Sequence, residues 1–301
     1  MCSLMPVARV TGCNKRGYWC FIEGIVIYLL LVSFIWAFSF GLIKGNLTGL
    51  DSNFVAFCRM LVSLLIFLPF LKLPRNKRKF NLKLAAIGAL QFGIMYITYI
   101  AAFKTLKAYE VALFTIFTPI YVTLIEDALQ KKFNPLYLLT ATVAVGGTWI
   151  IQGQAVLSPG VISGFLLVQI SNLCFAFGQI AYRRVLAQET GARDIEVFGF
   201  LYLGATGLTL LATLVFVPIS SISITAKQVW TLIYLGAVAS GISFFLWNIG
   251  ARKVNTGALA IFNDLKIPLA VTVSLLVFKE QTNLPNLLIG GCIVIAALIL
   301  N

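Results

Sequence analysis

The sequence has no histidine, and only 10 of its 301 residues are acidic. Histidine is the usual general base near neutral pH and a common metal ligand, so its absence argues against hydrolytic and metal-dependent chemistry. The sequence also contains no Gly-x-x-x-x-Gly-Lys-Ser/Thr phosphate loop and no Gly-x-Ser-x-Gly turn. Its six cysteines show no zinc-type spacing. We therefore predict that the chain is not an enzyme and that it has no catalytic residues, no metal and no cofactor.

Charge is scarce as well. Charged residues make up 11% of the chain, whereas hydrophobic residues make up 60% and the mean hydropathy is +0.96. A soluble domain carries far more charge, so we expect the lipid bilayer to be the solvent. A bilayer core about 30 Å thick needs roughly 20 apolar residues per helix, and such runs recur along nearly the whole chain. We predict an all-α integral membrane protein with ten transmembrane helices, at 24–43, 53–71, 82–103, 109–128, 134–152, 160–182, 196–217, 228–250, 256–277 and 284–300.

The basic residues indicate how the chain lies in the membrane. The net charge of +13 does not point to nucleic acid, because the basic residues lie between the apolar runs and not on one face of a domain. Most of them fall on the side of the N-terminal tail, with the strongest cluster at 75–79. The positive-inside rule therefore predicts that both termini are cytoplasmic, with residues 1–23 as a basic tail. The expected location is the inner membrane of a bacterium, as a multi-pass protein.

The two halves of the chain resemble each other. Residues 87–93 match residues 235–241 at an offset of 148, and the helices predicted at 24–43 and 160–182 correspond at an offset of 139. Each half holds five predicted helices, so the second half must enter the membrane from the opposite side. We therefore predict two inverted repeats. Inverted repeats are typical of transporters that open alternately to either side of a midplane site, although a duplication can also simply enlarge a bundle.

Several short motifs occur in a particular order along the chain. The run at 36–44 begins Trp-Ala, continues through small and apolar residues and ends in Lys, and residues 57–59 read Phe-Cys-Arg before an apolar run. Pro119 and Pro268 then occupy corresponding places in the two halves. In this order the motifs resemble those of the drug/metabolite transporters that have ten helices and two EamA-type repeats. Ala37 stands where that family usually has glycine.

Glu280 follows Pro268 at the distance of the family's helix-end glutamate, whereas the same step from Pro119 reaches Lys131 and departs from the pattern. The resemblance covers residues 24–301, so that the two repeats would be residues 24–152 and 153–301. It implies secondary transport or export of amino acids, other small metabolites or amphipathic drugs through a cavity between the repeats. It names no substrate.

Two ionisable residues, Asp264 and Lys266, lie near the middle of the helix predicted at 256–277. Charges at that depth are costly and are functional candidates by default. Two residues along a helix correspond to about 200°, so these side chains point to nearly opposite faces. We expect Asp264 to hold the cationic end of a substrate or to carry protons, and Lys266 or Asn263 to hold a carboxylate. The alternative is that each charge pairs with a neighbouring helix and stabilises the fold.

Pro119 and Pro268 lie near the centres of two predicted helices. Proline cannot donate to the carbonyl four residues earlier, so Thr115 and Asp264 are predicted to keep free carbonyl groups. Free backbone groups inside a membrane need protein or water partners, which favours a place beside an interior cavity. A plain packing kink is the alternative.

A polar stripe and several aromatic residues complete the predicted site. Gln169, Asn172, Gln179 and Arg183 recur at helical spacing on one face, which should not contact lipid. Aromatic rings can stack on a planar or cationic substrate. The predicted substrate-binding residues are Ser33, Trp36, Phe40, Tyr99, Thr115, Gln169, Asn172, Gln179, Ser243, Trp247, Asn263, Asp264 and Lys266. The predicted structural or gating residues are Lys44, Arg59, Pro119, Arg183 and Pro268.

The sequence therefore favours a secondary transporter, an exporter or exchanger, that carries an amino acid or amino-acid-like metabolite by alternating access. A larger amine or a nucleoside-linked amino acid such as S-adenosylmethionine is the alternative within that class, and a membrane-embedded enzyme or lipid-handling protein is the alternative outside it. The expected partners are the substrate, the bilayer, and protons or a counter-substrate. A Gly-x-x-x-Gly spacing at Gly160 and Gly164 permits close packing within the chain or in a homodimer, so both states stay open.

Overall fold

The computed structural model describes residues 15–72, 77–131, 136–152, 158–189, 193–218, 220, 222–253 and 256–300. Throughout these ranges the regular elements are helices, and the described residues form no strand. The elements are α1 (Lys15–Asn46), α2 (Ser52–Phe67), η1 (Leu68–Phe70), α3 (Arg78–Gly88), η3 (Ala89–Ile94), α4 (Met95–Ala102), α5 (Ala108–Phe114), η4 (Thr115–Phe117), α6 (Thr118–Gln130), α7 (Leu136–Gln152), α8 (Pro159–Ala187), α9 (Asp194–Val197), α10 (Gly199–Phe216), α11 (Ala226–Tyr234), η7 (Leu235–Ile242), α12 (Ser243–Lys253), α13 (Thr256–Leu276) and α14 (Leu284–Leu300).

Within the described residues, seven helical segments are long and apolar enough to cross a bilayer. They are Ile27–Asn46, Ser52–Phe70, Arg78–Ala102, Ala108–Gln130, Pro159–Ala187, Asp194–Phe216 and Ala226–Lys253. Parts of α13 and α14 are apolar but shorter, at Leu265–Leu276 and Leu284–Ile293. All ten predicted stretches contain helix, yet ten membrane crossings stay a prediction. The first helix begins at Lys15, earlier than expected, because Lys and Arg readily extend a helix beyond its apolar run.

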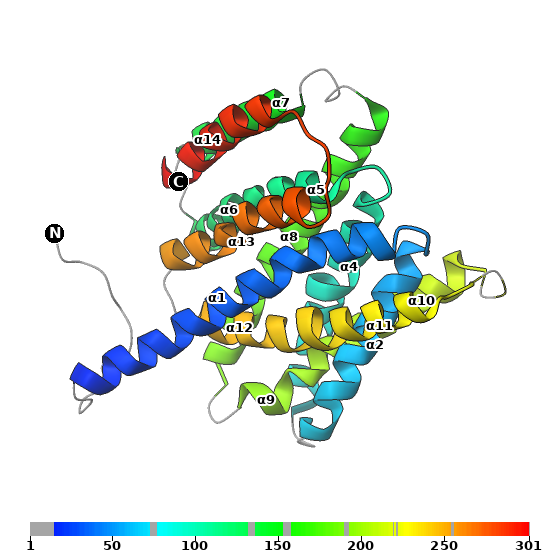
Figure 1. Ribbon diagram of the computed structural model, residues 1–301. Helices are drawn as coiled ribbons and strands as arrows, with labels where there is room; N and C mark the ends of the chain where they lie inside the picture. The colour runs from blue at the N-terminus through cyan, green and yellow to red at the C-terminus, as the bar shows by residue number, and fades with distance from the viewer. Residues whose placement is uncertain are drawn as a thin grey trace.

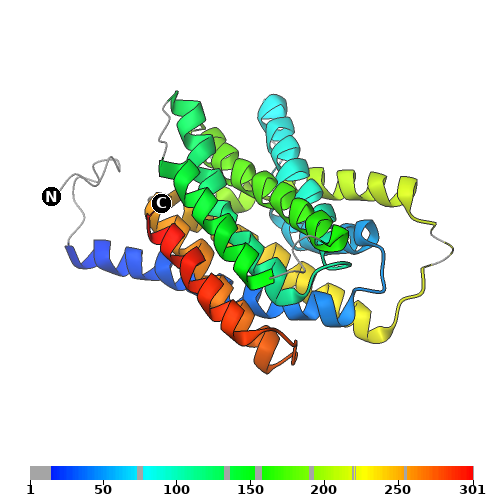
Figure 2. The same ribbon diagram turned by 90° about the horizontal axis from the view of Figure 1, so that it is seen from above.

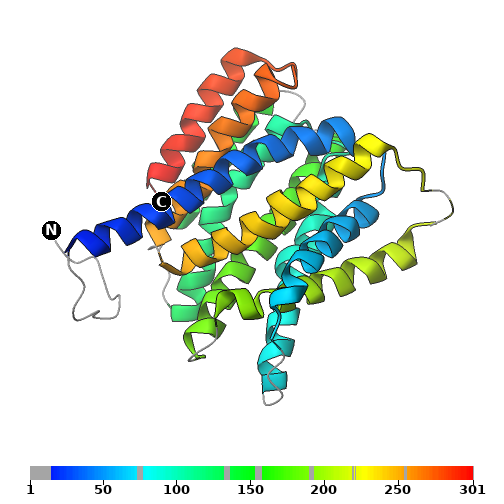
Figure 3. The ribbon, with the colours of Figure 1, turned by 60° about the horizontal axis from the view of Figure 1, so that its bottom comes forward.

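The helix contacts between the two halves occur in matching pairs, in which the two halves exchange places. α1 packs on α13 and α12, and its counterpart α8 packs on α6 and α4. In the same way α2 packs on η7, and α10 packs on η3. Figure 1 and Figure 2 show α7 and α14 side by side at one edge of the bundle, and Figure 3 shows α1 running between α13 and α12. The two halves therefore interlock, while their opposed orientation in the membrane stays a prediction.

Two π-helical segments, η3 and η7, occupy matching places in the two halves. A π turn contains one residue more than an α turn and is often found at functional sites. Close backbone approach occurs beside η3, where a Cβ atom at Gly88 would overlap the backbone of Leu201 on α10. Glycine allows two helices to come this close. The two π segments therefore lie where α10 and α2 cross them.

The ends of α6 and α13 also match. Lys131 has a φ of 55° and Lys279 a φ of 53°, the left-handed conformation that closes a helix. These lysines are separated by the same offset as residues 87–93 and 235–241. Lys131 therefore corresponds to Lys279 and not to Glu280, whose counterpart at position 132 lies outside the described residues.

The outer surface of α8 is apolar and its inner face is polar. Leu166, Leu173 and Phe177 are exposed, whereas Asn172 and Gln179 are both 4% exposed. An apolar outer face is suited to lipid, and buried amides need partners inside the protein. The polar stripe predicted for this helix thus contributes Asn172 and Gln179 to the interior, while Gln169 and Arg183 are half-buried.

Candidate functional site

A cavity lies inside the bundle, between helices of both halves. The space open to the centres of water molecules is about 60 Å³, well above the roughly 10–15 Å³ that one water needs. Its walls come from α1, α2, α4, η4, α6, α8, α12 and α13. The bordering residues are Trp36, Ser39, Phe40, Arg59, Met95, Tyr96, Tyr99, Thr115, Thr118, Ser171, Asn172, Phe175, Phe244 and Lys266.

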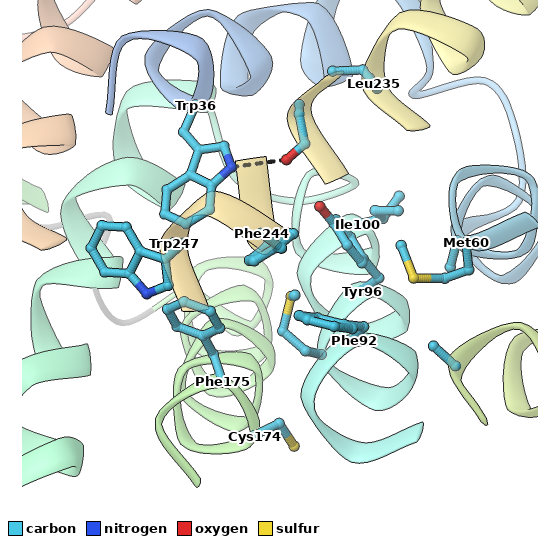
Figure 4. Close-up of a cluster of buried hydrophobic side chains, with 14 of the residues drawn as sticks. Trp36, Met60, Phe92, Tyr96, Ile100, Cys174, Phe175, Leu235, Phe244 and Trp247 are labelled. Carbon is cyan, nitrogen blue, oxygen red and sulfur yellow. Dashed lines mark hydrogen bonds between the residues drawn. The ribbon is translucent and has the colours of Figure 1, made fainter. Parts of the chain in front are cut away.

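Trp36 is the centre of an aromatic cluster, part of which borders the cavity. Its ring centroid lies 4.9 Å from that of Phe244, 5.0 Å from that of Trp247 and 6.1 Å from that of Phe175. Figure 4 shows these rings together, with the bond of 2.9 Å from the indole nitrogen of Trp36 to the carbonyl oxygen of Ala239. Ring contacts and a satisfied indole N–H hold the side chain in one orientation.

Lys266 places a buried positive charge at this aromatic cluster. Its side chain is 6% exposed, and its Nζ lies 5.1 Å from the ring centroid of Trp36 and 5.9 Å from that of Phe175. The ammonium group donates a hydrogen bond of 3.0 Å to Oδ1 of Asn263. Aromatic faces attract a cation electrostatically, and more strongly where water is excluded. The rings and the amide therefore hold the Lys266 charge in place.

Arg59 on α2 places a second buried positive charge at the cavity. It is 1% exposed, and it donates to the hydroxyl groups of Ser240 at 3.1 Å and Tyr96 at 2.8 Å. The two hydroxyl groups are 2.9 Å apart and also share a hydrogen bond. The guanidinium carbon lies 4.2 Å from the ring centroid of Tyr96. A hydrogen-bonded triangle and a stacking contact thus fix the guanidinium group.

The π-helical segment η7 supplies Ser240 to this triangle and is fastened by side chains from three helices. Ser63 on α2 donates to the carbonyl of Gly236 at 2.8 Å. Tyr202 on α10 donates to the carbonyls of Ser240 and Gly241 at 2.7 and 2.8 Å, and Trp36 on α1 holds a further carbonyl. Backbone groups inside a membrane must find such internal partners. These bonds therefore position Ser240 beside Arg59.

The polar end of the cavity lies where α8 meets η4. Asn172 donates to the carbonyl of Phe114 at 2.8 Å, and Gln169 reaches the same oxygen at 3.4 Å. The carbonyl of Thr115 was expected to be free, and this expectation is wrong. It accepts hydrogen bonds from the hydroxyl of Thr118 at 2.7 Å and from the backbone N–H of Thr118. The chain tightens into a 3₁₀ turn before Pro119, so the missing N–H of proline is compensated locally.

The interior face of α13 differs from the predicted one. Asn263, Lys266 and Ala270 are buried, whereas Pro268 is exposed. Pro268 does not border the cavity, although one interpretation of this proline predicted that it would, and the alternative of a packing kink stays open. The interior side of α13 is the one on which Lys266 meets Trp36 of α1. The side chain of Asp264 lies outside the described residues, so its roles as a substrate contact and a proton carrier stay predictions.

Several residues predicted to touch substrate are not among those that border the cavity. Trp247 is buried, and its indole nitrogen donates to Gln179 at 3.3 Å. The hydroxyl of Ser33 donates to backbone carbonyls at 2.9 and 3.2 Å. Polar groups engaged in this way stabilise helix contacts. The other predicted contacts that do not border the cavity are Gln169, Gln179, Ser243 and Asn263.

Two helix ends are joined on one side of the bundle. Glu280, which follows α13, accepts hydrogen bonds from the backbone N–H groups of Ala108 at 2.9 Å and Tyr109 at 3.1 Å. A carboxylate is favourable at the N-terminus of a helix such as α5. Nearby, Lys44 donates to the carbonyl of Phe103 at 2.7 Å. These contacts join the helix ends to one another, and a gating role for Lys44 stays a prediction.

Several residues that border the cavity were not predicted from the sequence. The clearest are Phe175, Phe244 and Tyr96. The repeat could have found Phe175, because it stands at the offset of 139 from Trp36. Tyr96 and Phe244 each precede by three residues a position that was predicted, and they are separated by the offset of 148. Residues three apart share a helix face, so both signals were present in the sequence.

Comparison with known proteins gives a family match over most of the chain. Residues 24–153 and 162–301 each match the EamA-like transporter family. One solved crystal structure superposes with a TM-score of 0.67 over 92% of this chain and 96% of that chain, at 17% identity. At that identity the likeness concerns the fold alone.

Two bacterial relatives match almost end to end. A protein of Pseudomonas aeruginosa, named as a probable biotin transporter, is 36% identical over 276 residues, which is 91% of this chain and 96% of that protein. A protein of Escherichia coli K12, named as a biotin transporter, is 35% identical over 272 residues, which is 90% of each chain.

Proposed function

Because this chain belongs to the EamA-like transporter family, we propose that it carries a small carboxylate with the chemistry of biotin across the bilayer. The chain is an integral membrane protein that transports a small metabolite. As a transporter it is not an enzyme, which removes the membrane-enzyme alternative. What we propose beyond this is the class of substrate, and the names of the two bacterial relatives support it.

The observation that carries the proposal is the charge of the cavity. Arg59 and Lys266 both border it, and they are 1% and 6% exposed. No acidic side chain occurs among the described residues that border it. Buried cations are costly unless polar groups or an anion stabilise them. The cavity therefore favours an anionic substrate.

The remaining walls suit the rest of such a molecule. Biotin joins a carboxylate to an aliphatic chain and a fused ring system that carries a urea group. The rings of Trp36, Phe175 and Phe244 offer apolar surface to the chain and the fused rings. Asn172 and Thr118 offer polar groups to the urea. The substrate would thus lie with its carboxylate toward a cation and its urea toward α8.

An amino acid is less well supported than this carboxylate. The relatives are named for biotin, and the described border of the cavity offers no carboxylate to an ammonium group. S-adenosylmethionine carries a net positive charge, which Arg59 and Lys266 would repel. We therefore replace the expected amino-acid substrate by a small carboxylate.

Transport of labelled biotin into proteoliposomes tests this proposal. We expect uptake that unlabelled biotin and desthiobiotin suppress, and that lysine and methionine do not. Lys227→Met is a suitable control variant, because Lys227 is an exposed cation away from the cavity. Uptake of lysine or methionine without uptake of biotin would show that the proposed substrate class is wrong.

Coupling to protons through Asp264 is a separate part of the proposal. Asp264→Asn keeps the shape of the side chain but cannot carry a proton between two charge states. We expect it to abolish accumulation driven by a proton gradient while exchange of biotin at equal concentrations continues. Full accumulation by a folded Asp264→Asn protein would exclude this role. The same preparation can show whether the cycle alternates between the two sides of the membrane, as inverted repeats would predict.

A further inference from the structure

We propose that Arg59 binds the carboxylate of the substrate through its Nη1 nitrogen. This inference rests on the proposed transport of a carboxylate and adds which of the two buried cations holds it. The sequence suggested only a structural or gating role for Arg59, and it suggested Lys266 or Asn263 for the carboxylate. The contacts of the two cations reverse that assignment.

Hydrogen-bonding capacity is the first argument. A guanidinium group has five N–H bonds to donate. The Nε of Arg59 donates to Ser240 and its Nη2 to Tyr96. Its Nη1 is buried and has no hydrogen-bond partner in the part of the chain that the structure describes. Buried polar groups nearly always have a partner, so an unpaired donor on a residue that borders a cavity indicates a ligand.

Charge is the second argument. The ion pairs formed by the described residues do not include Arg59. Its two hydrogen-bond partners are hydroxyl groups, which do not neutralise a guanidinium ion. A carboxylate that reaches Nη1 supplies both the missing acceptor and the opposite charge. Hydrogen bonds between such ions are shorter and stronger than bonds between neutral groups.

Orientation is the third argument. Arg59 stacks on the ring of Tyr96, and the hydroxyls of Tyr96 and Ser240 hold two of its nitrogens. The planar group therefore presents its remaining nitrogen in a fixed direction before substrate arrives. A site that is ordered in advance binds more tightly, because less freedom is lost on binding.

Lys266 is a weaker candidate because its ammonium group is already engaged. It donates to Asn263 and lies near the rings of Trp36 and Phe175. A carboxylate at Lys266 would compete with these contacts, whereas a carboxylate at Nη1 of Arg59 would break no hydrogen bond of Arg59. We therefore assign Lys266 to the general positive potential of the cavity.

The test compares the affinity for biotin with the affinity for biotinamide, which has the same body and an uncharged end. Dissociation constants are measured by calorimetry on detergent-purified protein. Wild-type protein should prefer biotin, and Arg59→Met should reduce that preference by about 10-fold to 100-fold, the value of a hydrogen bond between charged groups. Binding of biotinamide should change little. An unchanged preference in folded Arg59→Met protein would overturn the inference.

Lys266→Met is the matched control, because it removes the other buried cation at the cavity. We expect it to reduce the preference clearly less than Arg59→Met does. An equal or larger reduction would assign the carboxylate to Lys266 and overturn the inference. Arg59→Lys is the second variant if Arg59→Met does not fold: it keeps a charge but lacks Nη1, so it should also lose preference, and full preference would contradict the proposal.

Failure of the proposed function gives a different result. Wild-type protein that binds neither biotin nor biotinamide would show that the proposed substrate is wrong. The same ratio measured with 4-phenylbutyrate and its amide then tests Arg59 by itself. Loss of the carboxylate preference in Arg59→Met supports the inference in that case too, and a retained preference overturns it.

Discussion

Arg59 on α2 and Lys266 on α13 border the same cavity, but their surroundings differ. Hydroxyl groups hold two nitrogens of Arg59 and leave Nη1 without a partner among the described residues. Aromatic rings and an amide surround Lys266. The difference teaches that equal burial does not imply an equal role. A charge held by directional bonds with one donor left over can select a ligand, whereas a charge held over ring faces mainly sets the local potential.

Trp36→Ala should have the largest effect, because it disrupts the surroundings of Lys266. It removes a ring below the ammonium group and leaves the carbonyl of Ala239 without its partner. Loss of a buried tryptophan costs about 3–5 kcal/mol of stability, so we expect a large fall in the melting temperature in detergent and loss of biotin uptake. A melting temperature close to that of wild type would contradict the central place of this ring.

Trp36→Phe is the matched control for that change. It keeps an aromatic face near Lys266 but removes the indole N–H. The unpaired carbonyl should cost about 1–3 kcal/mol, less than the full truncation, and the preference of the protein for biotin over biotinamide should persist. Equal damage from both substitutions would show that the hydrogen bond matters more than the ring.

Ser240→Ala should weaken the contacts that hold the guanidinium group of Arg59. It removes the acceptor of the Arg59 Nε and a partner of Tyr96, so the guanidinium group loses its fixed direction. We expect the preference for biotin over biotinamide to fall by about tenfold, which corresponds to roughly 1.4 kcal/mol. Ser63→Ala is the control, because Ser63 also bonds η7 but does not touch the guanidinium group. An equal loss in Ser63→Ala would mean that general loosening of η7 explains the result.

Asn263→Leu should have a smaller effect, on the Lys266 side. Leucine has the same branching as asparagine, although its two methyl groups take up more space, and it cannot accept from Nζ. Side-chain hydrogen bonds inside membrane proteins average about 0.6 kcal/mol, so affinities for biotin and biotinamide should both fall by about threefold. Calorimetry with both ligands measures these affinities. A loss of affinity for biotin alone would indicate that the carboxylate binds at Lys266.

Glu189→Gln should have the smallest effect. It is the control for loss of a charge that lies outside the cavity. Glu189 pairs with Lys77 at 2.6 Å, and both side chains are partly exposed. Such pairs contribute about 0–1 kcal/mol, so the melting temperature, biotin uptake and preference for biotin should stay close to wild type. A loss of carboxylate preference in this variant would show that the assay responds to net charge and not to the cavity.

Helix positions and buried charges could be predicted from the sequence, because both follow from local composition. Long apolar runs leave few possibilities inside a bilayer, and a charge such as Lys266 within such a run must turn inward. Which side of α13 faces the interior could not be predicted, because Asp264 and Lys266 are expected on nearly opposite faces and the cost of a charge in lipid applies to both. Burial there depends on how α1 and α5 pack on the helix, which the residues of α13 do not encode.

The contrast between Ser240 and Ser243 shows a second limit. Ser243 and Trp247 were predicted to touch substrate, yet neither borders the cavity, and it is Ser240 that bonds Arg59. The π turn of η7 ends at Ile242 and changes the phase of the helix by one residue. An apolar sequence gives little sign of a π turn. A helix face that is predicted from residues before the turn therefore does not continue in the same direction after it.

The fastening of η7 also bears on the speed of transport. Three side chains, Trp36, Ser63 and Tyr202, hold its carbonyl groups from three separate helices. If each contributes about 0.6 kcal/mol, releasing all of them adds about 1.8 kcal/mol to a barrier. That would slow a step by about 20-fold. Motions of domains and helices take microseconds to milliseconds, so a turnover that releases η7 once per cycle can still occur many times per second.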